Sequence, residues 1–338
     1  MQSRSGAKSP RMTRFLAILA VIPVMALGAC ASTGNSPEPA ASNSAQTGDS
    51  PATVRIAIAN TGTMLPILVA DQQGFFEDHN IDIEITTLAD ISKIPPALGN
   101  QFDIGMGVQP IFIKAATAGL DIVQVSEGAI SSKDTPAMVL MAKSDAGITS
   151  PKDFVGKRIG TPVPTGNIHL GVEYWLSQNG VDLKSFSTVQ VATPNMIDQL
   201  KQGLIDVGEV IVPFNTVAEK AGLVKVGYGM DTVADPVGFT SWISSSGWAD
   251  KSQQTIVDFR AALGDAQKWI KENDSAAKKM VAEYTKVDQA IVDGAPLSNW
   301  SNQNTVGDLE AWIPVLKNVT NFTTSIKLED LIAYPTDK

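Results

Sequence analysis

The sequence predicts a two-lobed α/β protein in which each lobe is built on a mostly parallel sheet flanked by helices. Short apolar runs that read as strands alternate with segments of helical spacing from about residue 54 to residue 228, and this alternation is typical of a parallel sheet covered on both faces. One strand–turn–helix phrase is present twice, at Asp103–Leu120 and Asp206–Leu223, with 7 identities in 18 positions. The 338 residues, 43% of them hydrophobic, are enough for two ordinary cores.

The first α/β unit is expected up to about residue 143. Short or alternating apolar runs predict strands at 54–59, 81–86, 102–107, 120–128 and 136–143. Helices are predicted at 64–80, 90–100 and 109–119. Pro66 suits the first turn of the first helix, where a missing N–H costs no hydrogen bond.

The second unit and a helical tail follow. Strands are predicted at 157–162, 186–192, 205–212 and 223–228, with a returning strand at 237–245. Helices are predicted at 166–180, 194–203 and 213–222. The tail has helical spacing at 252–274, 275–287, 288–298, 305–319 and 325–334. We expect Trp269, Trp300 and Trp312 on this tail to belong to the core.

The duplicated phrase predicts a ligand cleft. Each copy is a strand that ends in glycine, followed by a helix opened by proline: Gly105 and Pro110 in one, Gly208 and Pro213 in the other. Ligands of open parallel sheets bind beyond the carboxyl ends of the strands, where helix N-termini offer free N–H groups. We therefore expect the two copies to face each other across a shared site; the alternative is that they only shape turns.

The N-terminus has the pattern of a secretory signal. Residues 1–14 carry four basic residues and no acid, and Phe15–Leu27 is an apolar run of 13 residues. This run is too short to remain as a membrane-spanning helix. We therefore expect residues 1–29 to be a signal peptide and the protein to be exported.

Cys30 is the one cysteine of the chain and follows Leu27-Gly28-Ala29, a pattern that resembles the bacterial lipobox. A single cysteine cannot form an internal disulfide, so we expect Cys30 to be lipidated and to anchor the protein to the outer face of the cytoplasmic membrane. Residues 30–52 then comprise this cysteine and a flexible tether, because the segment is small, polar and dotted with proline.

The charge balance argues against a nucleic-acid partner. The chain carries a net charge of −9, and removal of the four basic residues in 1–29 leaves −13. Such an acidic protein is repelled by a phosphate backbone. After the signal, no stretch approaches the roughly 18 apolar residues that a membrane span requires.

Four motifs carry a family resemblance. They are a leucine–proline helix start that leads to Gly-Phe-Phe at 74–76, the strand at 81–84, the phrase at 154–160, and the segment at 200–214 that ends in Pro-Phe. In this order they resemble the ABC-importer substrate-binding proteins of the nitrate/sulfonate/taurine and thiamine-precursor branch. Asn80 stands where that family usually has glycine.

The resemblance covers roughly residues 54–335 and implies the type II periplasmic-binding-protein fold, with extra C-terminal helices on lobe 1. Lobe 1 is expected at 53–138 plus 243–338 and lobe 2 at 139–242, with hinges near 136–142 and 237–244. The implied mechanism is hinge closure around one solute, followed by docking on a membrane permease with its ATPase. We expect a monomer with no cofactor and no metal; a ligand sensor uncoupled from transport is the alternative.

By the family's pattern, the cleft residues are neutral hydrogen-bonding groups with two aromatic rings: Thr61, Gly62, Met64, Gln109, Ser131, Ser132, Thr165, Gly166, Asn167, Phe214, Asn215 and Trp242. None is basic, so nitrate finds no counter-charge, whereas helix N-termini can hold a sulfonate. Phe214 and Trp242 can stack on a ring or a cation. We expect a sulfonate- or taurine-like solute; the alternative is a pyrimidine-type thiamine precursor or other nitrogenous solute.

Three ionisable residues each have two alternative roles. Glu127 and Glu209 lie near predicted strand ends, where they either pair with an ammonium group or are simply solvated. His169 is the one candidate for acid–base chemistry, and its alternative role is capping or packing. The sequence has no nucleophile, zinc or phosphate-loop motif, and it lacks the cysteine-rich segment of a relative of this fold that makes a pyrimidine precursor. We therefore expect no enzymatic activity.

Overall fold

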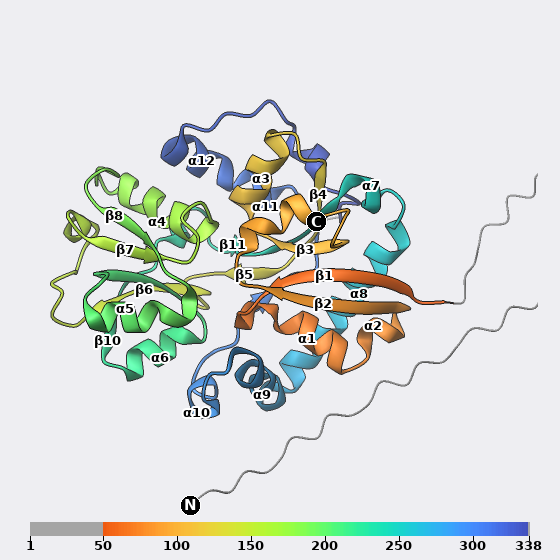
Figure 1. Ribbon diagram of the computed structural model, residues 1–338, viewed down its shortest axis with the longest axis horizontal. Helices are drawn as coiled ribbons and strands as arrows, with labels where there is room; N and C mark the ends of the chain where they lie inside the picture. The colour runs from red at the N-terminus through yellow and green to blue at the C-terminus, as the bar shows by residue number, and fades with distance from the viewer. Residues whose placement is uncertain (1–49, 337–338) are drawn as a thin grey trace, which may run out of the picture. The chain divides into compact units, whose positions relative to one another are not determined.

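Two five-stranded sheets with the same topology organise the chain (Figure 1). The computed structural model describes residues 50–336, so the predicted signal peptide, Cys30 and most of the predicted tether lie outside the described residues. The first sheet has the order β2-β1-β3-β12-β4, with bounds at Ile81–Leu88, Ala52–Ala59, Ile104–Gly107, Ser241–Ser245 and Ile122–Glu127. β1 is parallel to β2 and β3, and β12 is antiparallel to β3 and β4.

The second sheet repeats this arrangement. Its order is β8-β7-β9-β6-β10, with bounds at Ser187–Gln190, Arg158–Thr161, Val207–Ile211, Met138–Lys143 and Leu223–Gly227. β7 is parallel to β8 and β9, and β6 is antiparallel to β9 and β10. Strand by strand this is the order of the first sheet, so the predicted two-lobed α/β class is confirmed. We call the elements on the first sheet lobe 1 and those on the second lobe 2.

A small third sheet holds the two segments that pass between the lobes. Its order is β11-β5-β13, with bounds at Val237–Gly238, Ala129–Ser131 and Asn299–Trp300. The crossing segments therefore lie before β6 and before β12. Because β6 begins at Met138 and pairs along its length with β9, most of the expected hinge at 136–142 is a strand of lobe 2.

Helices cover both large sheets. In lobe 1 they are α1, α2, α3, α7, α8 and α9, with bounds at Leu65–Gln72, Phe75–Asp78, Gln109–Thr117, Ser246–Ala249, Gln253–Glu272 and Asp274–Thr285. In lobe 2 they are α4, α5 and α6, at Asn167–Gln178, Met196–Gln202 and Phe214–Lys220. The tail continues with α10, α11 and α12, at Gln289–Val292, Gly307–Glu310 and Trp312–Thr320.

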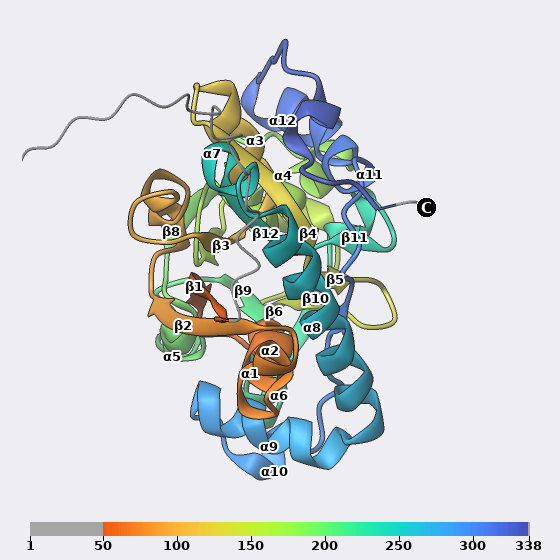
Figure 2. The same cartoon turned by 90° about the vertical axis from the view of Figure 1, so that its right-hand side faces the viewer.

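The C-terminal helices pack on lobe 1, as the fold class predicts. α8 lies against α1 and α2 (Figure 2). Its Phe259 stacks on Phe76 and meets Trp242 edge-on, with ring centroids 5.9 Å apart in each pair. The tail also reaches lobe 2, because α12 packs on α4, where Ser177 Oγ donates to Asn318 Oδ1 at 2.8 Å. α12 therefore joins the two lobes on the side away from α9 (Figure 1).

Several predicted helices differ from what the structure contains; the one expected at 288–298, for example, is helical only at Gln289–Val292. The helix expected at 64–80 is split into α1 and α2 at Gly74, whose φ of 77° ends a right-handed helix. The segment 90–100 forms two short 3-10 turns, at Ile91–Lys93 and Pro95–Ala97, because consecutive prolines remove the N–H groups that an α-helix needs. The segment 325–334 forms a 3-10 turn at Leu328–Leu331.

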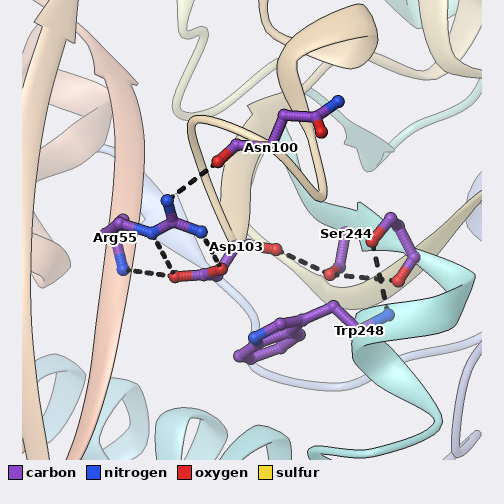
Figure 3. Close-up of polar contacts among 6 residues, drawn as sticks. Arg55, Asn100, Asp103, Ser244 and Trp248 are labelled. Atoms are coloured by element: carbon purple, nitrogen blue, oxygen red, sulfur yellow. Dashed lines mark hydrogen bonds and ion pairs between the residues drawn. The ribbon is translucent and has the colours of Figure 1, made fainter.

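The duplicated aspartate binds an arginine of the neighbouring parallel strand. In lobe 1, Arg55 of β1 donates from Nε and Nη2 to the carboxylate of Asp103, at 2.9 and 2.6 Å, and from its backbone N–H at 2.9 Å (Figure 3). Arg55 Nη1 also donates to the carbonyl of Asn100, and Ser244 Oγ donates to the carbonyl of Asp103 (Figure 3). These contacts fix the register of β1, β3 and β12 at the end away from the cleft.

Candidate ligand site

A cavity of about 330 Å³ lies where the carboxyl ends of the parallel strands of both lobes meet. Lobe 1 contributes the loops after β1 and β2 and the end of β3: Ala59, Asn60, Thr61, Thr63, Leu88, Ala89, Ile91, Met106 and Val108. Lobe 2 contributes the loops after β7 and β8 and the end of β9: Pro162, Val163, Gly166, Asn167, Ile168, Gln190, Ala192, Thr193, Pro194 and Ile211. Phe239 of the second crossing segment completes the wall. The position is the one that open parallel sheets favour for ligands.

The lobes also touch beside this cavity. Gly62 of lobe 1 faces cis-Pro213 of lobe 2, and a Cβ added at Gly62 would lie 3.6 Å from Pro213 Cδ. Both residues line a small apolar hollow with Val212 and Val281. The duplicated proline of lobe 2 therefore meets the loop after β1, so the phrase contributes to the interface between the lobes.

Four of the six polar side chains in the cavity wall, those of Thr61, Thr63, Asn167 and Gln190, bond to one another or to the backbone. Thr61 Oγ1 and Thr63 Oγ1 share a hydrogen bond of 2.6 Å. Asn167 Nδ2 donates to the carbonyl of Phe239 at 2.6 Å, and Gln190 Nε2 donates to the carbonyl of Pro162 at 3.3 Å. The Asn167 bond joins the start of α4 to a crossing segment, which couples this helix to the hinge region.

Of the twelve predicted cleft residues, the structure brings three together in the cavity wall: Thr61, Gly166 and Asn167. Gly62 is at the neighbouring interface. Met64 and Trp242 belong instead to the core of lobe 1, because Met64 is fully buried and Trp242 packs on Phe259 of α8. The strand alternation of β12 points Trp242 away from the cavity.

The other predicted residues lie on the surface or around the crossing segments. Gln109 is fully buried and donates to Asp308 Oδ2 at 2.8 Å. Ser131 Oγ bonds to Tyr228 Oη at 2.6 Å, and burial raises the pKa of Tyr228 to about 12. Ser132 forms a turn with Thr135. Thr165 is exposed, and Phe214 and Asn215 are half-buried at the start of α6. None of these six lines the cavity described above.

Sequence reasoning missed most of the wall. The missed polar residues are Asn60, Thr63, Gln190 and Thr193, and the remainder are apolar. The signal that was present is positional: Asn60 and Thr193 come directly after predicted parallel strands, and Gln190 lies near the end of the strand predicted at 186–192. Apolar wall residues have no such signal, because they resemble core residues in sequence.

His169 and Glu209 form a buried pair beneath the cavity. His169 Nδ1 lies 2.7 Å from Glu209 Oε1, and His169 Nε2 lies 2.8 Å from Thr188 Oγ1. Burial by itself would lower the pKa of His169, but the carboxylate of Glu209 outweighs it, so the pKa is raised. Both side chains are buried, so Glu209 is not the solvated acid that the sequence allowed, and His169 has the packing role.

Glu127 lies beside a second hollow of about 190 Å³ behind the crossing segments. Its Oε1 accepts a hydrogen bond of 2.7 Å from Thr305 Oγ1. Asp308 lines the same hollow, and burial raises the pKa of its carboxyl to about 7. A Cβ at Gly238 would collide with this carboxylate, so the tail packs directly against β11 of the second crossing segment.

Comparison with known proteins assigns the family. The model of the family described as NMT1/THI5 like matches residues 61–277, which is well over half of the chain and includes all but two of the residues in the cavity wall. The chain belongs to the NMT1/THI5-like family. The recognition made from the four sequence motifs is thereby confirmed.

Two relatives of the chain differ in their descriptions. The chain is 29% identical over 153 residues, 45% of its length and 46% of the relative's, to 4-amino-5-hydroxymethyl-2-methylpyrimidine phosphate synthase of Legionella pneumophila. It is 24% identical over 221 residues, 62% of its length and 63% of the relative's, to the putative binding protein YtlA of Bacillus subtilis. In both cases the match spans less than two thirds of the relative's own length.

Solved structures share the fold of the NMT1/THI5-like chain. The periplasmic aliphatic sulphonate binding protein SsuA of Escherichia coli superposes with a TM-score of 0.70 at 16% identity, over 84% of this chain and 98% of that one. The periplasmic nitrate-binding protein NrtA of Synechocystis PCC 6803 gives a TM-score of 0.68 at 14% identity, over 82% and 84%. The predicted periplasmic-binding-protein fold is therefore confirmed. Within residues 50–336, no helix combines the length and the apolar character that crossing a membrane requires.

Proposed function

We propose that this protein is the extracytoplasmic solute-binding component of an ABC importer. The observation that carries the proposal is the cavity of about 330 Å³ whose wall comes from both lobes and from a crossing segment. A site divided in this way is completed only when the lobes close, so binding and closure are coupled. The fold shared with SsuA and NrtA supports the same role.

The lobes that we propose follow the expected bounds, residues 53–138 plus 243–338 and residues 139–242, except that Met138 goes with β6 in lobe 2 and Ser241 and Trp242 go with β12 in lobe 1. Thr61 and Asn167 are the side chains that we propose to touch the solute first, one from each lobe, because both lie in the wall at the ends of parallel strands. The sequence favoured a sulfonate- or taurine-like solute over a pyrimidine-type precursor. The cavity holds either by size, since sites for small molecules start near 300 Å³.

A catalytic role has less support. The synthase name of one relative favours it, but the candidate acid–base residue, His169, has both ring nitrogens engaged in lobe 2 and does not line the cavity. We propose that binding, and not turnover, is the function of the site.

The test measures closure. Dyes are attached at cysteines introduced for Lys93 of lobe 1 and Lys184 of lobe 2, both exposed, in a Cys30→Ser background that has no other cysteine. We expect a compound from a panel of alkanesulfonates, taurine, aminopyrimidines, amides and nitrate to raise energy transfer between them. The control pair, Lys93 and Glu77, lies within lobe 1 and should not respond. A panel that leaves both energy transfer and melting temperature unchanged contradicts the proposal.

Export and anchoring are proposed from the sequence. We propose that residues 1–29 are removed and that Cys30 carries the lipid, which keeps the protein beside its permease. Wild type should remain with the membrane after washing at high salt, whereas Cys30→Ser should be released with unchanged solute affinity. Loss of solute uptake on deletion of the gene would identify an importer component, whereas unchanged uptake would identify a sensor.

A further inference from the structure

The cavity wall has no charged residue, and this argues against the charged, sulfonate- or taurine-like solute that the sequence led us to expect. None of the twenty wall residues is Asp, Glu, Lys, Arg or His. Asp90 lies between the wall residues Ala89 and Ile91, but its carboxylate accepts hydrogen bonds from the backbone N–H and the hydroxyl of Ser92, at 3.1 and 2.6 Å. His169, next to Ile168, is paired with Glu209. A charged group enclosed here would lose its water without gaining a partner, which is costly.

Apolar surface dominates the wall. Met106, Val108, Ile168, Ile211 and Phe239 are all buried and come from both lobes and a crossing segment. Phe239 is the one aromatic side chain among the wall residues, so a flat ring finds no second aromatic face to stack on. The volume equals that of about eleven waters, far more than an ion such as nitrate fills. These features suit an aliphatic body that is larger than a small ion.

The polar groups of the wall that have no hydrogen-bond partner among the described residues are all uncharged side chains, those of Asn60 and Thr193, or the start of α4. α4 begins at Asn167 with Gly166 as its N-cap and has no side-chain cap, so the first N–H groups of this helix face the cavity wall unsupported. The helix end provides only about half a positive charge. That partial charge is enough for a carbonyl dipole. A sulfonate or carboxylate can also bind at a helix start, but here it would be neutralised only in part, because no wall side chain carries a positive charge.

Resting on the proposed function, we propose that the cavity binds an uncharged organic molecule with a largely aliphatic body and a carbonyl-type oxygen. The oxygen accepts from the start of α4, and the body fills the apolar space between the lobes. Alkanesulfonates, carboxylates and ammonium-bearing zwitterions such as taurine are disfavoured, because no side chain of the wall carries the opposite charge.

The experiment compares four probes that share one body. Cyclohexanecarboxamide, cyclohexanecarboxylate, cyclohexanesulfonate and cyclohexylmethylammonium are titrated against the full chain in detergent, with binding followed by calorimetry and ligand-observed NMR. We expect the carboxamide to bind at least tenfold more tightly than each charged probe. A charged probe that binds as well as the carboxamide, or a carboxamide that does not bind, overturns the inference.

A charge-insertion variant tests the same point from the protein's side. Val163→Lys places an ammonium group in the wall, and we expect it to raise the affinity for the sulfonate and carboxylate at least tenfold. The matched control is Val155→Lys, in the same lobe, because Val155 is 57% exposed and outside the wall. The control should behave as wild type; an unchanged preference in Val163→Lys also overturns the inference.

Failure of this inference is distinguishable from failure of the proposed function. If a charged compound binds and raises energy transfer between the lobes, the solute class is wrong but the protein remains a closing solute-binding protein. If no compound of any class produces closure, the proposed function itself is wrong.

Discussion

Arg158 binds Asp206 in lobe 2 through the same contacts with which Arg55 binds Asp103 in lobe 1. The backbone N–H and Nε of Arg158 donate to Asp206 Oδ2 at 2.8 and 2.9 Å, and Nη2 donates to Oδ1 at 2.8 Å. Each arginine lies 48 residues before its aspartate, and each also donates to the carbonyl three residues before that aspartate. The duplicated phrase therefore repeats this arginine–aspartate contact as a strand-pairing clamp, while the cavity residues at the opposite ends of the strands differ.

The two clamps should contribute unequally to stability. Asp103→Ala should lower the free energy of unfolding by about 1–3 kcal/mol, because the lost carboxylate leaves partly buried donors without a partner. Asp206→Ala should cost less, since the side chain of Asp206 is 29% exposed and that of Asp103 is 8%. Urea unfolding of the two variants makes the comparison; a larger loss for Asp206→Ala would contradict it.

Arg260 is predicted to hold the C-terminal tail on lobe 1. Its guanidinium is buried, and it donates to three backbone carbonyls: those of Val125 in β4 and of Ala333 and Tyr334 in the tail. Burial lowers the pKa of Arg260 to about 10. Arg260→Met keeps the volume but leaves these carbonyls without donors, so we expect a loss of about 2–4 kcal/mol. Hydrogen exchange should show faster exchange in 328–336, and unchanged protection there would refute the role.

Asp308 should make stability depend on pH. Burial raises the pKa of its carboxyl to about 7, while the hydrogen bond from Gln109 opposes the shift. The folded state then holds a proton that the unfolded chain releases near pH 4, so stability falls as pH rises from about 4 to about 7. Asp308→Asn should remove this fall and be more stable than wild type at pH 8, by an amount on the order of a few kcal/mol. Equal stability of the two proteins at pH 8 would exclude the effect.

The buried pair of His169 and Glu209 gives a second pH dependence of the same direction. The raised pKa of His169 means that its contribution is fully present below the unfolded value of 6.5 and is lost as pH rises through the folded value. His169→Phe should cost about 3–5 kcal/mol, because Glu209 stays buried without its partner. The control, His169→Phe with Glu209→Leu, should recover much of this loss. A double variant as unstable as the single one would show that packing, and not the unpaired acid, sets the cost.

The candidate site was only partly predictable from the sequence. Thr61, Gly166 and Asn167 follow directly on strands or open a helix, so the rule for parallel sheets places them correctly at the cavity. Trp242 and Met64 do not follow that rule: alternation along β12 turns Trp242 against Phe259 of α8, and Met64 is fully buried in the core. Gln109 lies within the phrase Asp103–Leu120, but its amide donates to Asp308 of the tail and does not reach the cavity. These two residues are 199 positions apart in the chain, so local sequence does not reveal the contact.

The sequence by itself determined the two-lobed α/β class, the position of most strands and the family. Apolar periodicity, glycine and proline are local signals, and the duplicated phrase is visible without any coordinates. The tertiary structure decided which side chains reach the cavity, that the wall carries no charge, and that the repeated aspartates bind Arg55 and Arg158. The physical reason is that these properties depend on the direction of each side chain and on partners distant in the chain, which packing of the lobes sets and local sequence does not.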